Sequence, residues 1–147
     1  MENIVRRKPA LNMHRCAFTG YRPQKMPFGF NESDPRCIDF KQRVKDAIQS
    51  LYEQGYRHFI SGGALGMDMF AAEAVLELRA QHSDMILEMV SPFDDQAARW
   101  SPELRARHDR LFAQADITTA TGHAYTRSAM FRRNHYLADN ADLLLTA

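Results

Sequence analysis

The stretch Ser61-Gly62-Gly63-Ala64-Leu65-Gly66-Met67-Asp68 decides the fold of this chain. It follows a short apolar run, Phe59-Ile60, and opens a long amphipathic segment from Met69 to Leu78. This order predicts a strand, a glycine-rich turn and a helix. The three glycines leave room for a ligand near the backbone, and the N–H groups at the start of the helix favour an anion. The stretch therefore predicts a phosphate-binding turn.

Apolar runs and helical patterns alternate along the rest of the chain. Strands are expected at 16–19, 58–61, 85–90, 116–119 and 142–146, and helices at 38–54, 67–81, 102–114 and 128–140, with a loop at 26–36. Gly55 is expected to end the first of these helices, and Ser101 is expected to cap the third. The alternation predicts a Rossmann-like three-layer α/β/α fold with a mostly parallel sheet of about five strands.

In such sheets, ligands bind beyond the carboxyl ends of the strands, so the segments that follow strands are the candidates for a site. They are residues 20–23, 62–68, 91–100 and 122–127. The ligand-binding residues predicted from these segments and from the start of the last helix are Gly20, Arg22, Ser61, Gly62, Gly63, Ala64, Gly66, Met67, Asp68, Gln96, Trp100, Arg133 and Asn134.

Each polar or aromatic candidate has a specific chemistry and a simpler structural alternative. Arg22 could pair with a phosphate or a carboxylate, or lie on the surface beside a turn. Trp100 could stack on a base while Gln96 bonds the edge of that base, or Trp100 could be buried in the core. Asp68 could bind a ribose hydroxyl, or only interact with the helix dipole. Arg132 and Arg133 point about 100° apart on a helix, so we expect one of them to face an anion.

The composition is that of an ordinary soluble globular protein, with 45% hydrophobic and 25% charged residues among 147. A net charge of +1 provides no strong field for nucleic acid or membrane. Residues 1–14 are expected to be a tail ahead of the first strand and not a secretory signal, so we expect a cytoplasmic protein. Cys16 and Cys37 are then expected to be free thiols, and the histidines show no metal-ligand spacing.

Three motifs in order resemble the SLOG superfamily, which groups the DNA-processing protein A and Lonely Guy families on a Rossmann-like fold. They are Thr19-Gly20-Tyr21-Arg22-Pro23, the glycine-rich stretch at 61–68, and Arg132-Arg133-Asn134 before the last apolar run. Together with Pro92-Phe93, Gln96 and Trp100, the first motif is most similar to the YpsA-like branch. The resemblance implies that residues 61–68 are the phosphate-binding loop. It also implies that Arg133-Asn134 matches the Arg-Asn pair of the DNA-processing family, and that Arg133 falls where Lonely Guy hydrolases carry an active-site arginine.

Lonely Guy hydrolases also need a Pro-Gly-Gly-x-Gly-Thr-x-x-Glu loop after the last strand, which supplies their glutamate. The sequence reaches Leu145-Thr146-Ala147 where that loop should begin. We therefore expect residues 15–147 to be a single SLOG-like domain that lacks its final glycine-rich loop.

Three functions follow as hypotheses. The first is a cytosolic sensor or accessory protein that binds a nucleotide or an ADP-ribose-like ligand, with no catalytic residue, metal or certain cofactor assigned. The second is an N-glycosidase of nucleoside monophosphates, and Glu73 and Glu77 lie too far along their helix to serve it well. The third is binding of single-stranded DNA, which would need a basic groove with stacking aromatic residues. A homodimer is expected only by analogy with related folds.

Overall fold

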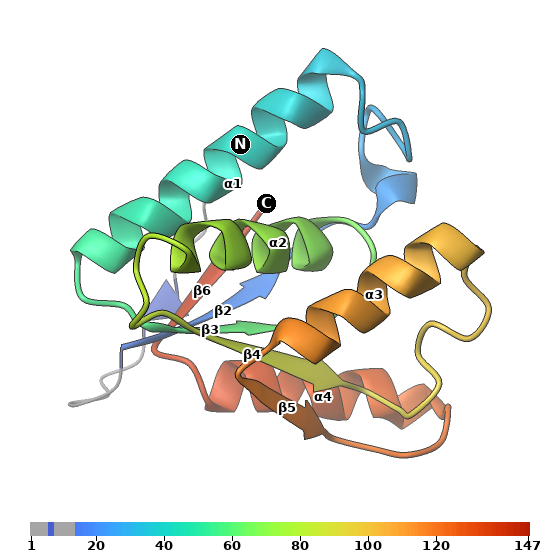
Figure 1. Ribbon diagram of the computed structural model, residues 1–147. Helices are drawn as coiled ribbons and strands as arrows, with labels where there is room; N and C mark the ends of the chain where they lie inside the picture. Colours follow the sequence, from blue (N-terminus) through green and yellow to red (C-terminus); the bar gives the residue numbers. More distant parts are fainter. Residues whose placement is uncertain (1–5, 8–13) are drawn as a thin grey trace.

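The computed structural model of the chain describes residues 6–7 and 14–147. A six-stranded sheet runs through it in the order β1-β6-β2-β3-β4-β5 (Figure 1). The strands are β1 (Arg6–Arg7), β2 (Arg15–Thr19), β3 (His58–Ser61), β4 (Ile86–Ser91), β5 (Ile117–Ala120) and β6 (Leu143–Thr146). The five strands from β2 to β6 pair in parallel, which confirms the predicted sheet.

The β1 strand was not predicted. It lies within the segment expected to be a tail, of which residues 1–5 and 8–13 fall outside the described residues. Arg6 pairs with Leu144 and Arg7 with Leu143, antiparallel to β6. The pairing gives backbone partners to the edge of β6, and a two-residue strand is too short to leave a hydrophobic period in the sequence.

Four helices cover the two faces of the sheet (Figure 1). They are α1 (Pro35–Glu53), α2 (Met67–Arg79), α3 (Pro102–Gln114) and α4 (Arg127–Asp139). The chain steps in one direction from β2 to β5, so right-handed crossovers place α1, α2 and α3 on one face. It then returns past β2 to reach β6, and this reversed step places α4 on the other face. The three-layer Rossmann-like architecture is thus confirmed.

The first helix begins three residues earlier than expected. Asp34 caps it by accepting a hydrogen bond from the Arg36 N–H at 2.9 Å, and Pro35 occupies the first turn. The loop expected at 26–36 is shorter as a result. The capping predicted at Ser101 is confirmed by the Leu104 N–H, which donates to its hydroxyl at 3.3 Å. Gly55, with φ of 103°, follows the end of α1 as predicted.

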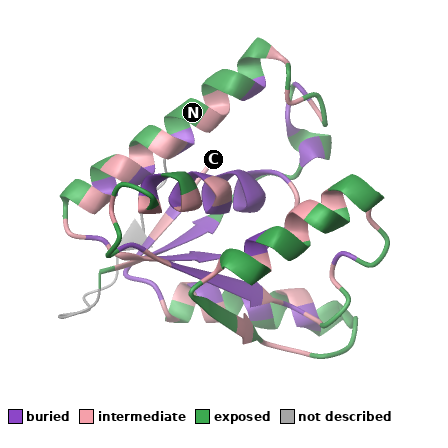
Figure 2. Cartoon of the chain, in the orientation of Figure 1, coloured by how far each residue is buried: buried purple, intermediate pink, exposed green. Residues whose placement is uncertain are grey.

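The main core lies between the sheet and the helices α1 to α3, and α2 is its centre (Figure 2). Most of α2 is buried, including the continuous run from Met67 to Ala72. A much smaller cluster underlies α4 and consists of Ala17, Ile60, Val90, Leu137 and Ala141. Cys16 and Cys37 are free thiols and both are buried. The glycine-rich loop therefore leads into the most deeply packed helix of the molecule.

Candidate functional site

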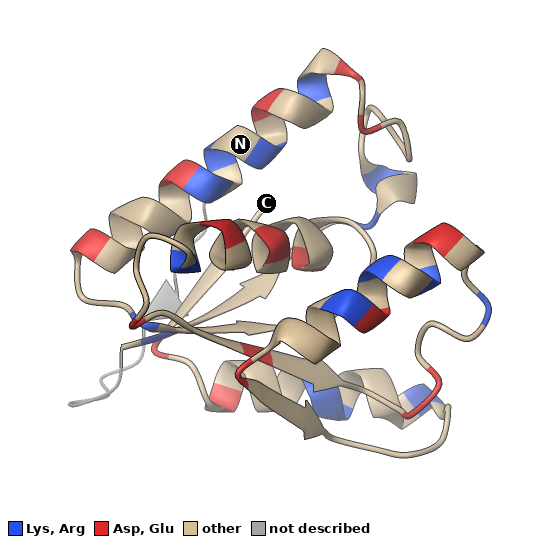
Figure 3. Ribbon diagram, viewed as in Figure 1, with Lys and Arg blue, Asp and Glu red and all other residues tan. Residues whose placement is uncertain are grey.

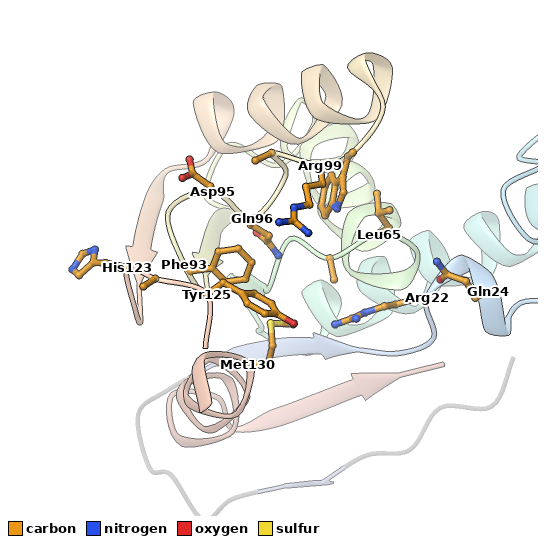
Figure 4. A pocket seen from close by; sticks show the side chains of 14 residues that line it. Arg22, Gln24, Leu65, Phe93, Asp95, Gln96, Arg99, His123, Tyr125 and Met130 are labelled. Atoms are coloured by element: carbon orange, nitrogen blue, oxygen red, sulfur yellow. The ribbon is translucent and has the colours of Figure 1, made fainter. Parts of the chain in front are cut away.

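A cavity of about 940 Å³ opens at the carboxyl ends of the parallel strands (Figure 4). Its walls come from the segments that follow four strands: Arg22 and Gln24 after β2, Ala64 and Leu65 after β3, residues 93–100 after β4, and residues 123–125 after β5. This volume lies within the range of known small-molecule sites. The edge of the sheet predicted from the sequence is thus where the cavity lies.

Two arginines dominate the charge of this cavity. The guanidinium groups of Arg22 and Arg99 point into it from different sides (Figure 4). Both side chains are exposed, and within the described part of the chain neither forms an ion pair. Asp95 and His123 also line it, on the side away from Arg22. Two unpaired cations in a hollow favour an anionic ligand.

Aromatic side chains supply the apolar part of the lining. Phe93 and Tyr125 meet edge to face, with ring centroids 5.2 Å apart. Trp100 lines the cavity and, partly buried, also packs against the main core, while its stacking on a base stays a prediction. Tyr125 is 77% exposed, which leaves most of its ring open to solvent. Rings of this kind can stack on a planar group of a ligand.

The glycine-rich loop folds around its own polar side chains beneath the cavity. The Ser61 hydroxyl donates to the Asp68 carbonyl at 2.8 Å and accepts from the Gly63 N–H at 3.3 Å. The Asp68 carboxylate accepts from the Ala64 N–H at 3.3 Å. Ser61 and Asp68 are buried, and only Ala64 and Leu65 of the loop line the cavity. Asp68 thus bonds within its own loop, and its contact with a ribose hydroxyl stays a prediction.

The Gly62 carbonyl joins three segments of the chain. It accepts hydrogen bonds from Arg133 Nη1 of α4 at 2.7 Å and from Gln96 Nε2 of the segment after β4 at 3.1 Å. A carbonyl oxygen has two lone pairs, so these bonds saturate it. Arg133 is only 4% exposed, and its Nε donates to the exposed Asn134 at 3.0 Å. Neither Arg133 nor Asn134 lines the cavity, and direct contact of either with a ligand stays a prediction.

Arg133 and Asp68 bring opposite charges close together in a buried place. Burial raises the pKa of Asp68 to about 6, although the Arg133 guanidinium and the Ala64 N–H act in the opposite direction. Burial also lowers the pKa of Arg133, and Asp68 partly restores it. Arg132, by contrast, is exposed and donates to Ser128 Oγ at 2.8 Å. The two arginines do diverge as predicted, but the inward one holds the loop.

Three of the predicted residues, Gly20, Gly66 and Met67, hold the end of β2 against the start of α2. The Met67 N–H donates to the Tyr21 carbonyl at 3.1 Å. Gly66 has a φ of 90°, and a Cβ there would collide with the same carbonyl oxygen. At Gly20 a Cβ would meet the Met67 side chain at 2.5 Å. Gly20, Gly66 and Met67 are thus needed for this close packing and do not line the cavity.

Of the predicted residues, the structure brings Arg22, Ala64, Gln96 and Trp100 together in one cavity. Sequence reasoning did not single out Arg99 and Tyr125. Both lie in segments expected at this edge of the sheet, and that position was the available signal. Within residues 6–7 and 14–147, no group of three or more His, Cys, Asp or Glu side chains is arranged to hold a metal ion. No helix in that part of the chain is both long and apolar enough to span a membrane.

Comparison with known proteins agrees with the motifs. Residues 16–147 match the family model described as the YspA SLOG family. The UPF0398 protein of Bacillus pumilus (strain SAFR-032) is 29% identical over 135 residues, which cover 90% of this chain and 72% of that protein. The UPF0398 protein YpsA of Bacillus subtilis (strain 168) is 27% identical over 135 residues, which cover 90% of this chain and 74% of that protein. The family match takes in every helix of the fold and all strands from β3 onward, and so the chain belongs to the YspA SLOG family, as its motifs predicted.

Proposed function

We propose that this chain binds a nucleotide or a nucleotide-derived phosphate ligand in the cavity at the carboxyl edge of its sheet, and that it acts as a sensor or accessory protein. The cavity carries the proposal because it combines three aromatic rings with two guanidinium groups that form no ion pair within residues 6–7 and 14–147. Arg22 and Arg99 suit phosphate oxygens. Phe93, Trp100 and Tyr125 suit the flat face of a base. Ala64 and Leu65, which precede α2, line the same cavity.

The geometry supports binding better than hydrolysis of a glycosidic bond. Glu73 and Glu77 of α2 pair with Arg107 and Lys45 and line a separate groove between α1 and α3. The carboxylate that lines the proposed site is Asp95, on the side away from Arg22. Binding of a nucleic acid strand is supported less, because the two cations face into a hollow and the net charge is only +1.

Isothermal titration calorimetry with AMP, ADP-ribose and inorganic pyrophosphate tests the proposal. We expect at least one nucleotide to bind the wild-type chain, and Arg22→Ala or Arg99→Ala to weaken binding by roughly 10-fold or more, as expected for loss of a charge-assisted hydrogen bond. Arg43→Ala is the matched control, since Arg43 pairs with Asp39 on α1 and lies outside the cavity lining. Equal affinities in all three variants would contradict the proposed site.

Two further arms separate the alternatives. Release of free base from nucleoside monophosphates, followed by chromatography, would indicate the N-glycosidase. A salt-dependent mobility shift with single-stranded DNA, in the absence of any nucleotide affinity, would favour the DNA-binding hypothesis. We expect neither result.

A further inference from the structure

We propose that His108 of α3 is a positioning residue whose Nε2–H fixes the orientation of the Gln96 amide in the wall of the cavity. The inference rests on the proposed function, because it takes Gln96 and Trp100 to be ligand contacts. Neither the motifs nor the lining of the cavity draws attention to His108, which contacts both residues from α3.

The orientation of Gln96 follows from its two partners. The Gly62 carbonyl can only accept a hydrogen bond, so the amide nitrogen of Gln96 must face it, at 3.1 Å. The amide oxygen then faces His108 Nε2, also at 3.1 Å. An amide oxygen can only accept as well, so His108 Nε2 must carry a proton. The hydrogen-bond network thereby assigns a proton to Nε2 of the histidine.

The imidazole ring is held where it can perform this role. It lies edge-on to Trp100, with ring centroids 5.3 Å apart, and against Phe112 at 4.4 Å. Its other nitrogen, Nδ1, lies 3.2 Å from the exposed carboxylate of Asp109, which can only accept, so Nδ1 also carries a proton when this contact forms. Burial lowers the pKa of His108, and Asp109 acts in the opposite direction. The Nε2–H is present both in the imidazolium and in the neutral form protonated on Nε2, so the bond to Gln96 persists in either state.

The fixed orientation of the Gln96 amide affects which ligands the cavity selects. Gly62 takes one N–H of Gln96 and His108 takes one lone pair of its oxygen, which leaves one donor and one acceptor free. Gln96 lines the cavity, and its amide lies near the middle of the view in Figure 4. Because His108 and Gly62 prevent the amide from flipping, the end that donates to a ligand and the end that accepts from it are fixed. The same ring also supports Trp100, so one side chain of α3 sets two parts of the wall.

Nuclear magnetic resonance of the ligand-free chain tests the positioning directly. We expect the ¹⁵N shifts of wild-type His108 to show a protonated Nε2 at pH 8, and the Gln96 side-chain amide to give a proton signal protected from exchange. The variants His108→Gln and His108→Met are close in volume, but only glutamine keeps an N–H donor near the position of Nε2. The protected Gln96 signal should persist in His108→Gln and be lost in His108→Met, and Gln96→Glu assigns it.

A neutral His108 protonated on Nδ1 alone in the wild-type chain would overturn the inference, and this measurement needs no variant to fold. An unchanged Gln96 signal in a folded His108→Met variant would do so too. In calorimetry with AMP as the probe, we expect His108→Met to weaken binding about 10-fold, the effect of one lost hydrogen bond, and His108→Gln to restore most of it. Equal losses of AMP affinity in both variants would mean that the N–H donor at position 108 does not matter for binding, which would overturn the inference. If AMP does not bind the wild-type chain, the proposed function fails for AMP, while the spectra still decide the role of His108.

Discussion

Two backbone carbonyl groups, those of Gly62 and Tyr21, connect the segments that form the site. The Gly62 carbonyl ties α4 and the segment after β4 to the glycine-rich loop. The Tyr21 carbonyl ties the end of β2 to the start of α2. In both places a glycine provides the room, because a Cβ at Gly62 would collide with Arg133 and one at Gly66 with Tyr21.

Replacement of Gly66 by alanine should destabilise the chain more than replacement of another glycine with positive φ. Gly29 is the matched control, since its φ is 56° and nothing lies within 4 Å of a Cβ built there. Gly66→Ala adds a collision with backbone to the conformational strain, so we expect a loss in the free energy of unfolding about 1–3 kcal/mol larger than that of Gly29→Ala. Urea denaturation measures both. Similar losses in the two variants would show that the collision with the Tyr21 carbonyl is relieved without a loss in the free energy of unfolding.

The raised pKa of Asp68 predicts that the stability of the chain depends on pH. Its pKa rises on folding from 3.8 to about 6, so the folded chain holds this proton over an interval where the unfolded chain has lost it. The stability contributed by this group is therefore highest below about pH 4 and falls as the pH rises to about 6, by about 3 kcal/mol in all. Asp68→Asn cannot titrate. The unfolding free energy of the wild-type chain relative to this variant should fall over that interval, and parallel pH curves would exclude the effect.

Among the helices, α4 is held in a different way from the other three. Among the described helices it is the one on its face of the sheet, over a small apolar cluster, so polar contacts carry more of its attachment. Tyr136 of α4 donates to the buried Glu88 at 2.5 Å, and His58 and Thr119 also contact this carboxylate. Burial raises the pKa of Glu88, but the three hydrogen bonds outweigh it and lower the pKa to about 2. This network fixes the helix that carries Arg133.

Tyr136→Phe should therefore loosen α4. It removes one hydrogen bond to a buried carboxylate and leaves the ring in place, so we expect a loss in unfolding free energy of about 1.5–3 kcal/mol. Tyr125→Phe is the control, because Tyr125 is exposed. Hydrogen exchange should show faster opening of α4 amides in Tyr136→Phe while α2 stays protected. Uniform exchange over both helices would argue against a separate attachment of α4.

Most helices and strands could be predicted from the sequence, but the long-range contacts between them could not. The five parallel strands and four helices were predictable because apolar runs alternate with helical periods of ordinary length. The start of α1 was wrong, because the cap at Asp34 and Pro35 lies ahead of the first apolar residues of the helix. The edge of the sheet that holds the cavity was also predictable. The partners of Glu88 and of Gly62 were not, because they lie between 30 and 71 residues away in the chain and meet only when the layers pack.

Across the described residues, charged side chains on the helices often form ion pairs, whereas the arginines at the cavity do not. Figure 3 shows acidic and basic residues interspersed over the helices α1, α2 and α3. Many of these are paired: Arg107 bridges Glu32 and Glu73, and Lys45 reaches Glu77. The cations that line the cavity, Arg22 and Arg99, form no ion pair within the described residues. Their positive field is therefore available to a ligand at the one edge where all the loops after β2 to β5 meet.

The fluorescence of Trp100 tests the central claim most directly, because it is the single tryptophan of the chain and it lines the cavity. Titration with AMP, ADP and ADP-ribose should change its emission in a saturable way, since a base placed against the cavity wall alters the surroundings of the indole. Arg22→Ala should shift the midpoint to roughly 10-fold higher ligand, as expected for one lost charge-assisted hydrogen bond, while Arg43→Ala leaves it unchanged. An emission that stays constant up to millimolar concentrations of all three nucleotides, in a folded wild-type chain, would contradict the account.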